Sequence, residues 1–363
     1  MSDENGGETE TAVMGMKAGQ DWALYGPFLD KTLIRNYMWM NIAGQIMPDW
    51  TPQVRFCELI LNGEYQGLYV MMEMIEVQKN RLNLTEYEDG DLIPSYLVRI
   101  EPKTNPDREL ENFSFYSYRM EEGKTFELLY PGLSHQNEHV LNYVETDLSE
   151  IERKIYAAEV TSGTHEWKNV LDMESFINYY ILEEFAGIID TFSASTYFYK
   201  DTRGKLKIGP VWDFNNASDN FFQPVAYDTF IVANRGWFGQ LMHDQEFVTG
   251  IVKRYRQLRK TVLSDEYLIN YVQETESWLG SAIDRNWKVW GYSFDTSVLD
   301  PHERRSAAEG NSDNLEAYNP VDYQQANEWM LNYMLQRAHW LDDNIDTLYQ
   351  YAHQSKYNGK TID

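Results

Sequence analysis

Two runs of strand-forming residues lie on either side of an Asn-Gly dipeptide in the first quarter of the chain. The run QVRFCELIL ends at Leu61, and EYQGLYVMMEMI begins at Glu64. The dipeptide between them, Asn62-Gly63, readily adopts the positive φ angles that a two-residue turn between antiparallel strands needs. The pattern therefore predicts a β-hairpin over residues 53–75.

Further strands and helices are predicted in a mixed order, followed by helices alone. Asp30 is a candidate N-cap for a helix that runs to about Met47, where Pro48 ends it. The other predicted elements are strands at 95–103 and 125–132, helical sequence over about 137–187, a second hairpin over 195–214 that turns at Arg203-Gly204, and helices near 245–264, 265–290 and 322–350. This order predicts an α+β fold with antiparallel hairpins and a helical C-terminal lobe.

The composition of the chain suggests how it divides. Residues 1–20 are rich in Gly, Glu and Thr and predict a flexible tail. Residues 21–243 carry the mixed strands and helices of an α/β core. Residues 244–363 form the helical C-terminal lobe, which we assign to the same domain.

The charge of the chain argues against two classes of partner. It has 57 acidic and 31 basic residues, a formal net charge of −26. Such a surface repels nucleic acid and anionic lipid. No apolar run reaches the ~18 residues of a membrane span. The N-terminus has no signal-peptide pattern, so either the protein stays inside the cell or the chain has been trimmed from a surface-associated or extracytoplasmic form.

Two aspartates flank the second predicted hairpin. Asp190 precedes its first strand and Asp213 follows its second. An antiparallel hairpin brings its open ends together, so these carboxylates are expected to lie close in space. In a phosphoryl-transfer site one acid orients the accepting hydroxyl group, and the other holds Mg²⁺ with a nearby amide oxygen, here from Asn215 or Asn216. The alternative is structural: Asp190 caps a loop and Asp213 bonds the backbone of a turn.

Three long motifs resemble the spore coat protein H (CotH) kinase-like family. They are DWALYGPFLDKTLIRN (21–36), RFCELILNGEYQGLYVMMEMIEVQKNRLNL (55–84) and STYFYKDTRGKLKIGPVWDF (195–214). The resemblance implies an atypical protein-kinase-like fold that uses ATP and Mg²⁺ to phosphorylate serine in a protein substrate. The acceptor protein and the oligomeric state are not indicated.

The resemblance also implies roles for individual residues. Asp190 matches the catalytic aspartate of the family, Asp213 matches its metal-binding aspartate, and Asn215 matches a second metal contact. The cofactor-binding positions that it implies are an acid on the first hairpin and basic residues on the next elements: Glu73, Arg81, Arg99 and Lys103.

The chain departs from the family pattern at three places. Relatives commonly read Glu-Lys-Ile-Lys where this chain has Glu73-Met74-Ile75-Glu76, which removes two positive charges. They read an aromatic residue, Gly and Asn where this chain has Ser218-Asp219-Asn220. The usual segment upstream of residue 21 is missing or unrecognisable. These departures favour, as one alternative, a catalytically inactive kinase-like binding module. The 26 Tyr and 11 Trp residues favour, as another, a glycan-binding or cell-surface scaffold protein.

Overall fold

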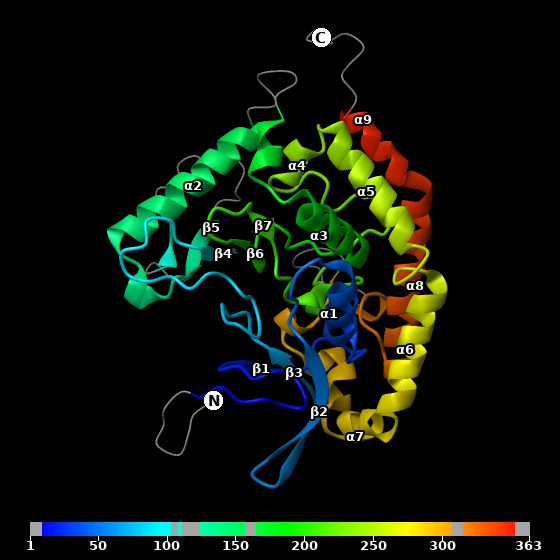
Figure 1. Ribbon diagram of the computed structural model, residues 1–363. Coiled ribbons are helices and arrows are strands. Elements are labelled where there is room, and N and C mark those ends of the chain that lie inside the picture. Colours follow the sequence, from blue (N-terminus) through cyan, green and yellow to red (C-terminus); the bar gives the residue numbers. More distant parts are fainter. Residues whose placement is uncertain (1–8, 103–107, 111–123, 157–164, 307–314, 353–363) are drawn as a thin grey trace.

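Two antiparallel β-sheets, each built around one hairpin, are joined and covered by helices (Figure 1). The computed structural model describes residues 9–102, 108–110, 124–156, 165–306 and 315–352. Buried apolar side chains from α1, both sheets and the C-terminal helices form one large, continuous core. The mixed α+β class predicted from the sequence is confirmed.

The first sheet has the strand order β1-β3-β2, from Trp22–Tyr25 (β1), Glu64–Glu73 (β3) and Val54–Leu61 (β2). The predicted hairpin is confirmed: β2 and β3 pair antiparallel, and Asn62 and Gly63 have φ angles of 52° and 85°. The Asn-Gly pair thus takes the left-handed conformation that the turn requires.

Helix α1 (Arg35–Ile46) begins later than the sequence pattern predicted. Residues 30–33 form a turn instead of a first helical turn, with Leu33 at a φ of 68°. The Asp30 carboxylate is buried and accepts hydrogen bonds from the backbone N–H groups of Thr32 and Arg35. Asp30 therefore does cap the start of the helix, but from outside it; the residue at the N-cap position is Ile34.

The second sheet has the order β5-β4-β6-β7, from Lys124–Tyr130 (β5), Tyr96–Pro102 (β4), Thr196–Lys200 (β6) and Lys207–Ile208 (β7). All three pairs are antiparallel. The second predicted hairpin is confirmed, with Arg203 at a φ of 59° in its turn. Its second strand has only two residues, because Gly209-Pro210 follows and proline has no N–H group for a ladder.

Helix α3 (Met173–Ala186) occupies the centre of the molecule (Figure 1). It contacts β7, α1, α5 and α8, and all its residues from Ser175 to Ala186 are buried. It ends at Gly187, which has a φ of 74°. The absence of a polar face in this sequence is thereby explained, since no side of the helix meets solvent.

Most of the remaining helices cover the core, and α5, α6 and α8 line one side of the molecule (Figure 1). Their bounds are Glu138–Tyr156 (α2), Phe238–Leu241 (α4), Gln245–Leu258 (α5), Asp265–Leu279 (α6), Ser281–Trp290 (α7), Tyr323–Asn344 (α8) and Tyr349–Ala352 (α9). The 3₁₀ turns are Leu133–His135 (η3), Glu166–Asn169 (η5), Phe214–Asn216 (η6), Gly291–Phe294 (η7), Thr296–Val298 (η8), Pro301–Glu303 (η9), Leu315–Ala317 (η10) and Ile345–Leu348 (η11). The helical run expected over 265–290 is two helices, because Gly280 interrupts it with a φ of 48°. Among the described residues, none of the helices combines the length and apolar character needed to span a bilayer.

Residues 9–20, part of the segment predicted as a flexible tail, make contacts with the rest of the protein, and Met16 and Gly19 are the buried residues among them. Thr11 and Gly19 exchange backbone hydrogen bonds, and Met16 is buried. Gly19 lies so close to the Arg81 guanidinium that a Cβ atom there would be 2.0 Å from Nη2. Burial of an apolar side chain and this close approach hold the segment in place. Residues 1–8 lie outside the described part of the chain.

Candidate functional site

Asp190 lies in the turn between α3 and β6. Its backbone carbonyl accepts hydrogen bonds from the N–H groups of Ser193 and Ala194, which closes the turn. Its side chain is used differently: Oδ2 accepts a hydrogen bond of 3.1 Å from the Asn216 amide. The loop is therefore closed by the backbone of Asp190, and the carboxylate points to the segment that carries Asp213.

Asp213 lies at the start of η6, directly after the second strand of the second hairpin. It has a φ of 67°, in the left-handed region. Burial raises the pKa of its carboxyl group, and the negative charges of Asp190 and Glu101 raise it further. Hydrogen bonds from the Ser195 side chain and the Asn215 backbone act in the opposite direction. The charge of Asp190 thus reaches the Asp213 carboxyl group, and the Asn216 amide links Asp190 to the segment after Asp213.

The two amides after Asp213 have different environments. Asn216 donates to Asp190, whereas the Asn215 Oδ1 atom is buried without a hydrogen-bond partner. A buried amide oxygen without a partner costs free energy, and a cation would satisfy it. Mg²⁺ prefers carboxylate and amide oxygens, so Asp213 and Asn215 fit such an ion. Within the described residues, no three Asp, Glu, His or Cys side chains gather as a metal cluster, so phosphate and water oxygens would have to complete its shell.

A third carboxyl group, that of Glu183 in α3, lies near the two aspartates. It is fully buried, and burial raises its pKa to about 8; the charges of Asp190 and Asp213 act in the same direction. The Thr191 hydroxyl group donates a 2.9 Å hydrogen bond to its Oε2 atom. The neighbouring Glu184 is bound elsewhere: it forms an ion pair with Arg337 of α8, buried on both sides.

A cleft of about 640 Å³ opens beside the Asp213 segment. Trp212, which precedes Asp213, lines it together with residues of the second sheet and with segments that flank strands of the first. The second sheet contributes Leu97, Arg99, Leu129, Tyr130 and Tyr197, and the chain after β3 contributes residues 74–78. The volume falls within the range of small-molecule and cofactor sites. The candidate metal-binding segment therefore borders, through Trp212, a cleft lined by the second sheet and by the chain after β3.

The predicted cofactor-binding residues are divided between this cleft and the protein interior. Arg99 lines the cleft and pairs with Glu127 at 2.9 Å. Glu73 and Arg81 do not line it. Glu73 is buried, and its Oε2 atom accepts a hydrogen bond from the Gln53 backbone. Lys103 lies outside the described residues.

Arg81 is held by the glutamate that replaces a lysine of the family pattern. Its Nη1 atom lies 2.5 Å from Glu76 and 2.8 Å from the Met74 carbonyl oxygen, and its guanidinium stacks on Trp22 at 5.0 Å. Burial raises the pKa of Glu76 to about 7, although Arg81 opposes this shift. Arg108, which no sequence motif pointed to, also lines the cleft and adds a positive charge there.

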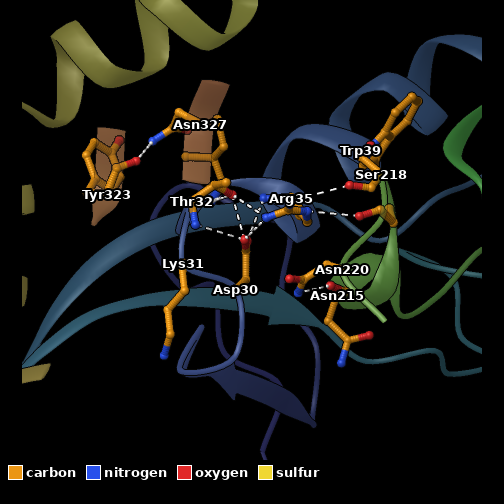
Figure 2. A network of polar contacts seen from close by, with 12 residues as sticks. Asp30, Lys31, Thr32, Arg35, Trp39, Asn215, Ser218, Asn220, Tyr323 and Asn327 are labelled. Carbon is orange, nitrogen blue, oxygen red and sulfur yellow. Dashed lines mark hydrogen bonds and ion pairs between the residues drawn. The ribbon is translucent and has the colours of Figure 1, made fainter. Parts of the chain in front are cut away.

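Helix α1 fixes the loop that follows Asp213 (Figure 2). Arg35 donates hydrogen bonds to the carbonyl oxygens of Ala217 and Ser218, at 2.9 and 3.3 Å. Trp39 donates to the Ser218 hydroxyl group at 3.0 Å, and Asn36 accepts from the Phe214 N–H at 3.0 Å. Three side chains from the first turns of one helix therefore set the path of the candidate metal-binding loop. We refer to these three residues as the α1 clamp.

The same loop contains the position where relatives have glycine. Asp219 takes a φ of 63° and Ser218 a φ of 52°, conformations that cost a non-glycine residue free energy. The Asp219 carboxylate offsets part of this cost, because it accepts hydrogen bonds from Arg305 at 2.8 Å and from the Val225 N–H at 2.7 Å. The loop thus keeps a glycine-like backbone without glycine.

The comparisons with known proteins identify the family of the chain. The family model described as CotH kinase protein matches residues 2–341 of the 363. No curated protein matches the chain closely enough to count as a relative. A match over nearly the whole chain, including both hairpins, the Asp190 turn and the Asp213 loop, shows that this chain belongs to the CotH kinase protein family.

Proposed function

We propose that this chain is an atypical protein kinase that transfers phosphate from ATP, with Mg²⁺, to serine residues of a protein substrate. The observation that carries the proposal is the hydrogen bond that links the Asp190 carboxylate to Asn216, in the segment after Asp213, near a cleft of about 640 Å³ lined by Trp212. Membership of a kinase-like family supports the same reaction class.

Each residue has a distinct role in this proposal. Asp213 and the unpartnered Oδ1 of Asn215 hold the metal ion. Bound Mg²⁺ would neutralise charge on the phosphate groups. Asp190, oriented by Asn216, accepts the hydrogen bond of the serine hydroxyl group and positions its oxygen for attack. Arg99 and Arg108 place positive charge along the cleft for the phosphates.

Nucleotide binding is tested by thermal unfolding of the full chain with and without Mg-ATP. We expect Mg-ATP to raise the Tm of the native protein, because a ligand that binds only the folded state stabilises it. In Asp213→Asn the shift should disappear. Asp284→Asn, which changes an exposed aspartate of α7, is the matched control and should keep it. If Mg-ATP leaves the native Tm unchanged at millimolar concentration, the nucleotide proposal is wrong.

Phosphate transfer is tested separately with radiolabelled ATP and analysis of labelled serine in the chain itself and in added protein mixtures. Asp190→Asn should lower transfer by about 10²-fold or more, the usual effect of removing a positioned proton acceptor. The Tm shift with Mg-ATP should persist in this variant, since Asp190 is not assigned to the metal.

A second candidate, a kinase-like module that binds nucleotide without transferring phosphate, is favoured by one specific observation. Glu76 places a carboxyl group at the cleft where relatives have lysine, and it also holds Arg81 away from the cleft. If Mg-ATP raises the Tm but no label is transferred, this second function replaces the first. Glu76→Lys would then be the variant in which to look for restored transfer.

A further inference from the structure

A second cavity, of about 300 Å³, lies on another part of the molecule. Its lining shares no residue with the cleft at Asp213 or with the residues assigned to phosphate transfer. It is formed by the segment before α1, by β3, by α7 and by the turns after α7. Five aromatic side chains line it: Phe28, Tyr69, Trp287, Trp290 and Tyr292. We call it the aromatic cavity.

The walls of the aromatic cavity are held in place from behind. The Trp290 indole N–H donates to the Gln66 carbonyl oxygen at 2.6 Å, and the Asn286 carbonyl oxygen accepts from the Leu68 N–H at 2.9 Å. Gly67, with a φ of 113°, makes room for both, because a Cβ atom there would lie 2.6 Å from the Trp290 nitrogen. The rings are thus positioned before any ligand arrives.

The rings face one another at an angle and are not stacked flat. The centroids of Phe28, Trp290 and Tyr292 lie 5.7, 6.4 and 6.2 Å apart, and their planes are inclined by 82°, 49° and 44°. At this spacing the three rings pack against one another and form one continuous aromatic wall of the cavity. Each ring presents a face of negative potential, which attracts a cation.

Negative charge near the aromatic cavity favours a positively charged ligand. Glu303 lines the cavity, and its Oε2 atom accepts a 3.0 Å hydrogen bond from the Asp300 N–H, which fixes the carboxylate. One fixed positive charge opposes this preference: the Lys31 ammonium group, which does not line the cavity, lies 4.6 Å from the Phe28 centroid. The net charge of −26 raises the local concentration of cations around the whole protein.

We propose that the aromatic cavity binds an alkylated ammonium group, either of a small quaternary amine such as choline or of a methylated lysine side chain. A sugar fits the cavity less well. Its hydroxyl groups need several polar partners. Asn286 is already bonded to Leu68 and Glu303 to Asp300, and the Trp287 indole N–H is the buried donor in the lining that has no partner within the described residues. A methylated ammonium group needs no hydrogen bonds and gains from both the ring faces and the carboxylate.

The test compares choline with its neutral carbon analogue, in which a tert-butyl group replaces the trimethylammonium group. The two have nearly the same shape, so a difference in affinity reports the charge. Each compound is titrated into the full chain, and binding is measured by calorimetry and by saturation-transfer NMR of the methyl protons. Choline should bind about tenfold or more tightly than its neutral analogue. Equal affinity for both, or no binding of either, would overturn the proposal, as would binding of neutral sugars but not of choline.

Matched variants locate the site. Tyr292 is 54% exposed, so it can be changed with little risk to the fold. Tyr292→Leu and Glu303→Gln should each weaken choline binding several-fold, whereas Tyr292→Phe keeps the ring and should retain it. Trp278→Leu removes an aromatic side chain that is 66% exposed and does not line the cavity, so it should change nothing. Binding that is unaffected by Tyr292→Leu and Glu303→Gln contradicts the assignment to this cavity.

The two sources of the ammonium group are separated by a peptide that carries trimethyllysine. If the peptide binds more tightly than choline and its unmethylated form does not, the ligand is a methylated protein. If choline binds equally or more tightly, the ligand is a small quaternary amine.

Discussion

Glu183 illustrates the free-energy cost of burying a carboxyl group near two other carboxyl groups. Its folded-state pKa is about 8, against an ordinary value of 4.5. Between these pH values the folded protein keeps a proton that the unfolded chain has released. Protonation of Glu183 therefore stabilises the fold at low pH, and this contribution is lost as the pH rises through about 8.

This linkage gives the first prediction. Glu183→Gln places a neutral amide where the protonated acid lies, and the amide oxygen can still accept the hydrogen bond of Thr191. Between about pH 5 and pH 8 the free energy of unfolding of the native protein should fall with pH, and Glu183 contributes at most about 1.4 kcal/mol per pH unit to this slope. The variant should show a shallower slope in urea unfolding measured across this range. Equal slopes for both proteins would mean that Glu183 titrates normally.

At the scale of the elements, the α1 clamp carries the second prediction. Arg35→Lys keeps a positive charge next to the buried Asp30 carboxylate, but one ammonium group cannot reproduce the bonds of a guanidinium to Asp30, Ala217 and Ser218 together. We expect the free energy of unfolding to fall by about 1–3 kcal/mol, together with weaker stabilisation by Mg-ATP, because the loop after Asp213 loses its support.

A suitable control for this variant is Arg55→Lys on β2. Within the described part of the chain, Arg55 bonds only to its neighbours in sequence, the Val54 carbonyl oxygen and the Gln53 side chain. The Arg55→Lys variant should change neither the midpoint of urea unfolding nor the Tm shift with Mg-ATP by much. If Arg35→Lys behaves like this control in urea unfolding and thermal-shift measurements, the clamp does not position the loop.

Sequence patterns predicted correctly those elements whose conformation depends on the residues within the element itself. The Asn62-Gly63 turn and the Arg203-Gly204 turn are confirmed, because positive φ angles depend on the residues at the turn itself. The start of α1 was misplaced, since Asp30 reaches the helix through a turn that no spacing rule indicates. The break at Gly280 was missed because the apolar pattern continues on both sides of it.

In the candidate site, too, some features follow from the local sequence and others depend on contacts between distant segments. The approach of Asp190 to Asp213 followed from hairpin geometry, which depends only on strand order. Arg81 is held by Glu76 and Trp22 and does not line the cleft. This placement depends on side chains that only folding brings together. The contacts of Arg35 with residues 217 and 218 cross more than 180 positions of sequence, so no local pattern contains them.

For the molecule as a whole, the excess of negative charge leads to the third prediction. A net charge of −26 repels itself in the folded state, and salt screens this repulsion. Raising NaCl from roughly 0.05 to 0.5 M should therefore increase the Tm by roughly 2 °C or more. Differential scanning fluorimetry would measure this, with sucrose at equal osmolality as the uncharged control. A Tm that stays constant or falls with salt would show that attractive ion pairs outweigh the repulsion.

The ion pair between Glu184 and Arg337 has a consequence for how far the chain can be shortened. Arg337 also binds the carbonyl oxygens of Tyr227 and Thr229, so one guanidinium joins α3, α8 and the segment before α4. A fragment that stops before Arg337 would remove the cation paired with the buried Glu184 carboxylate, which would then keep only the hydrogen bonds from the Ile231 and Val232 N–H groups, at a cost of about 3–5 kcal/mol. The smallest piece of this protein that can stand alone must therefore include its last long helix, although that helix lies far along the chain from either aspartate.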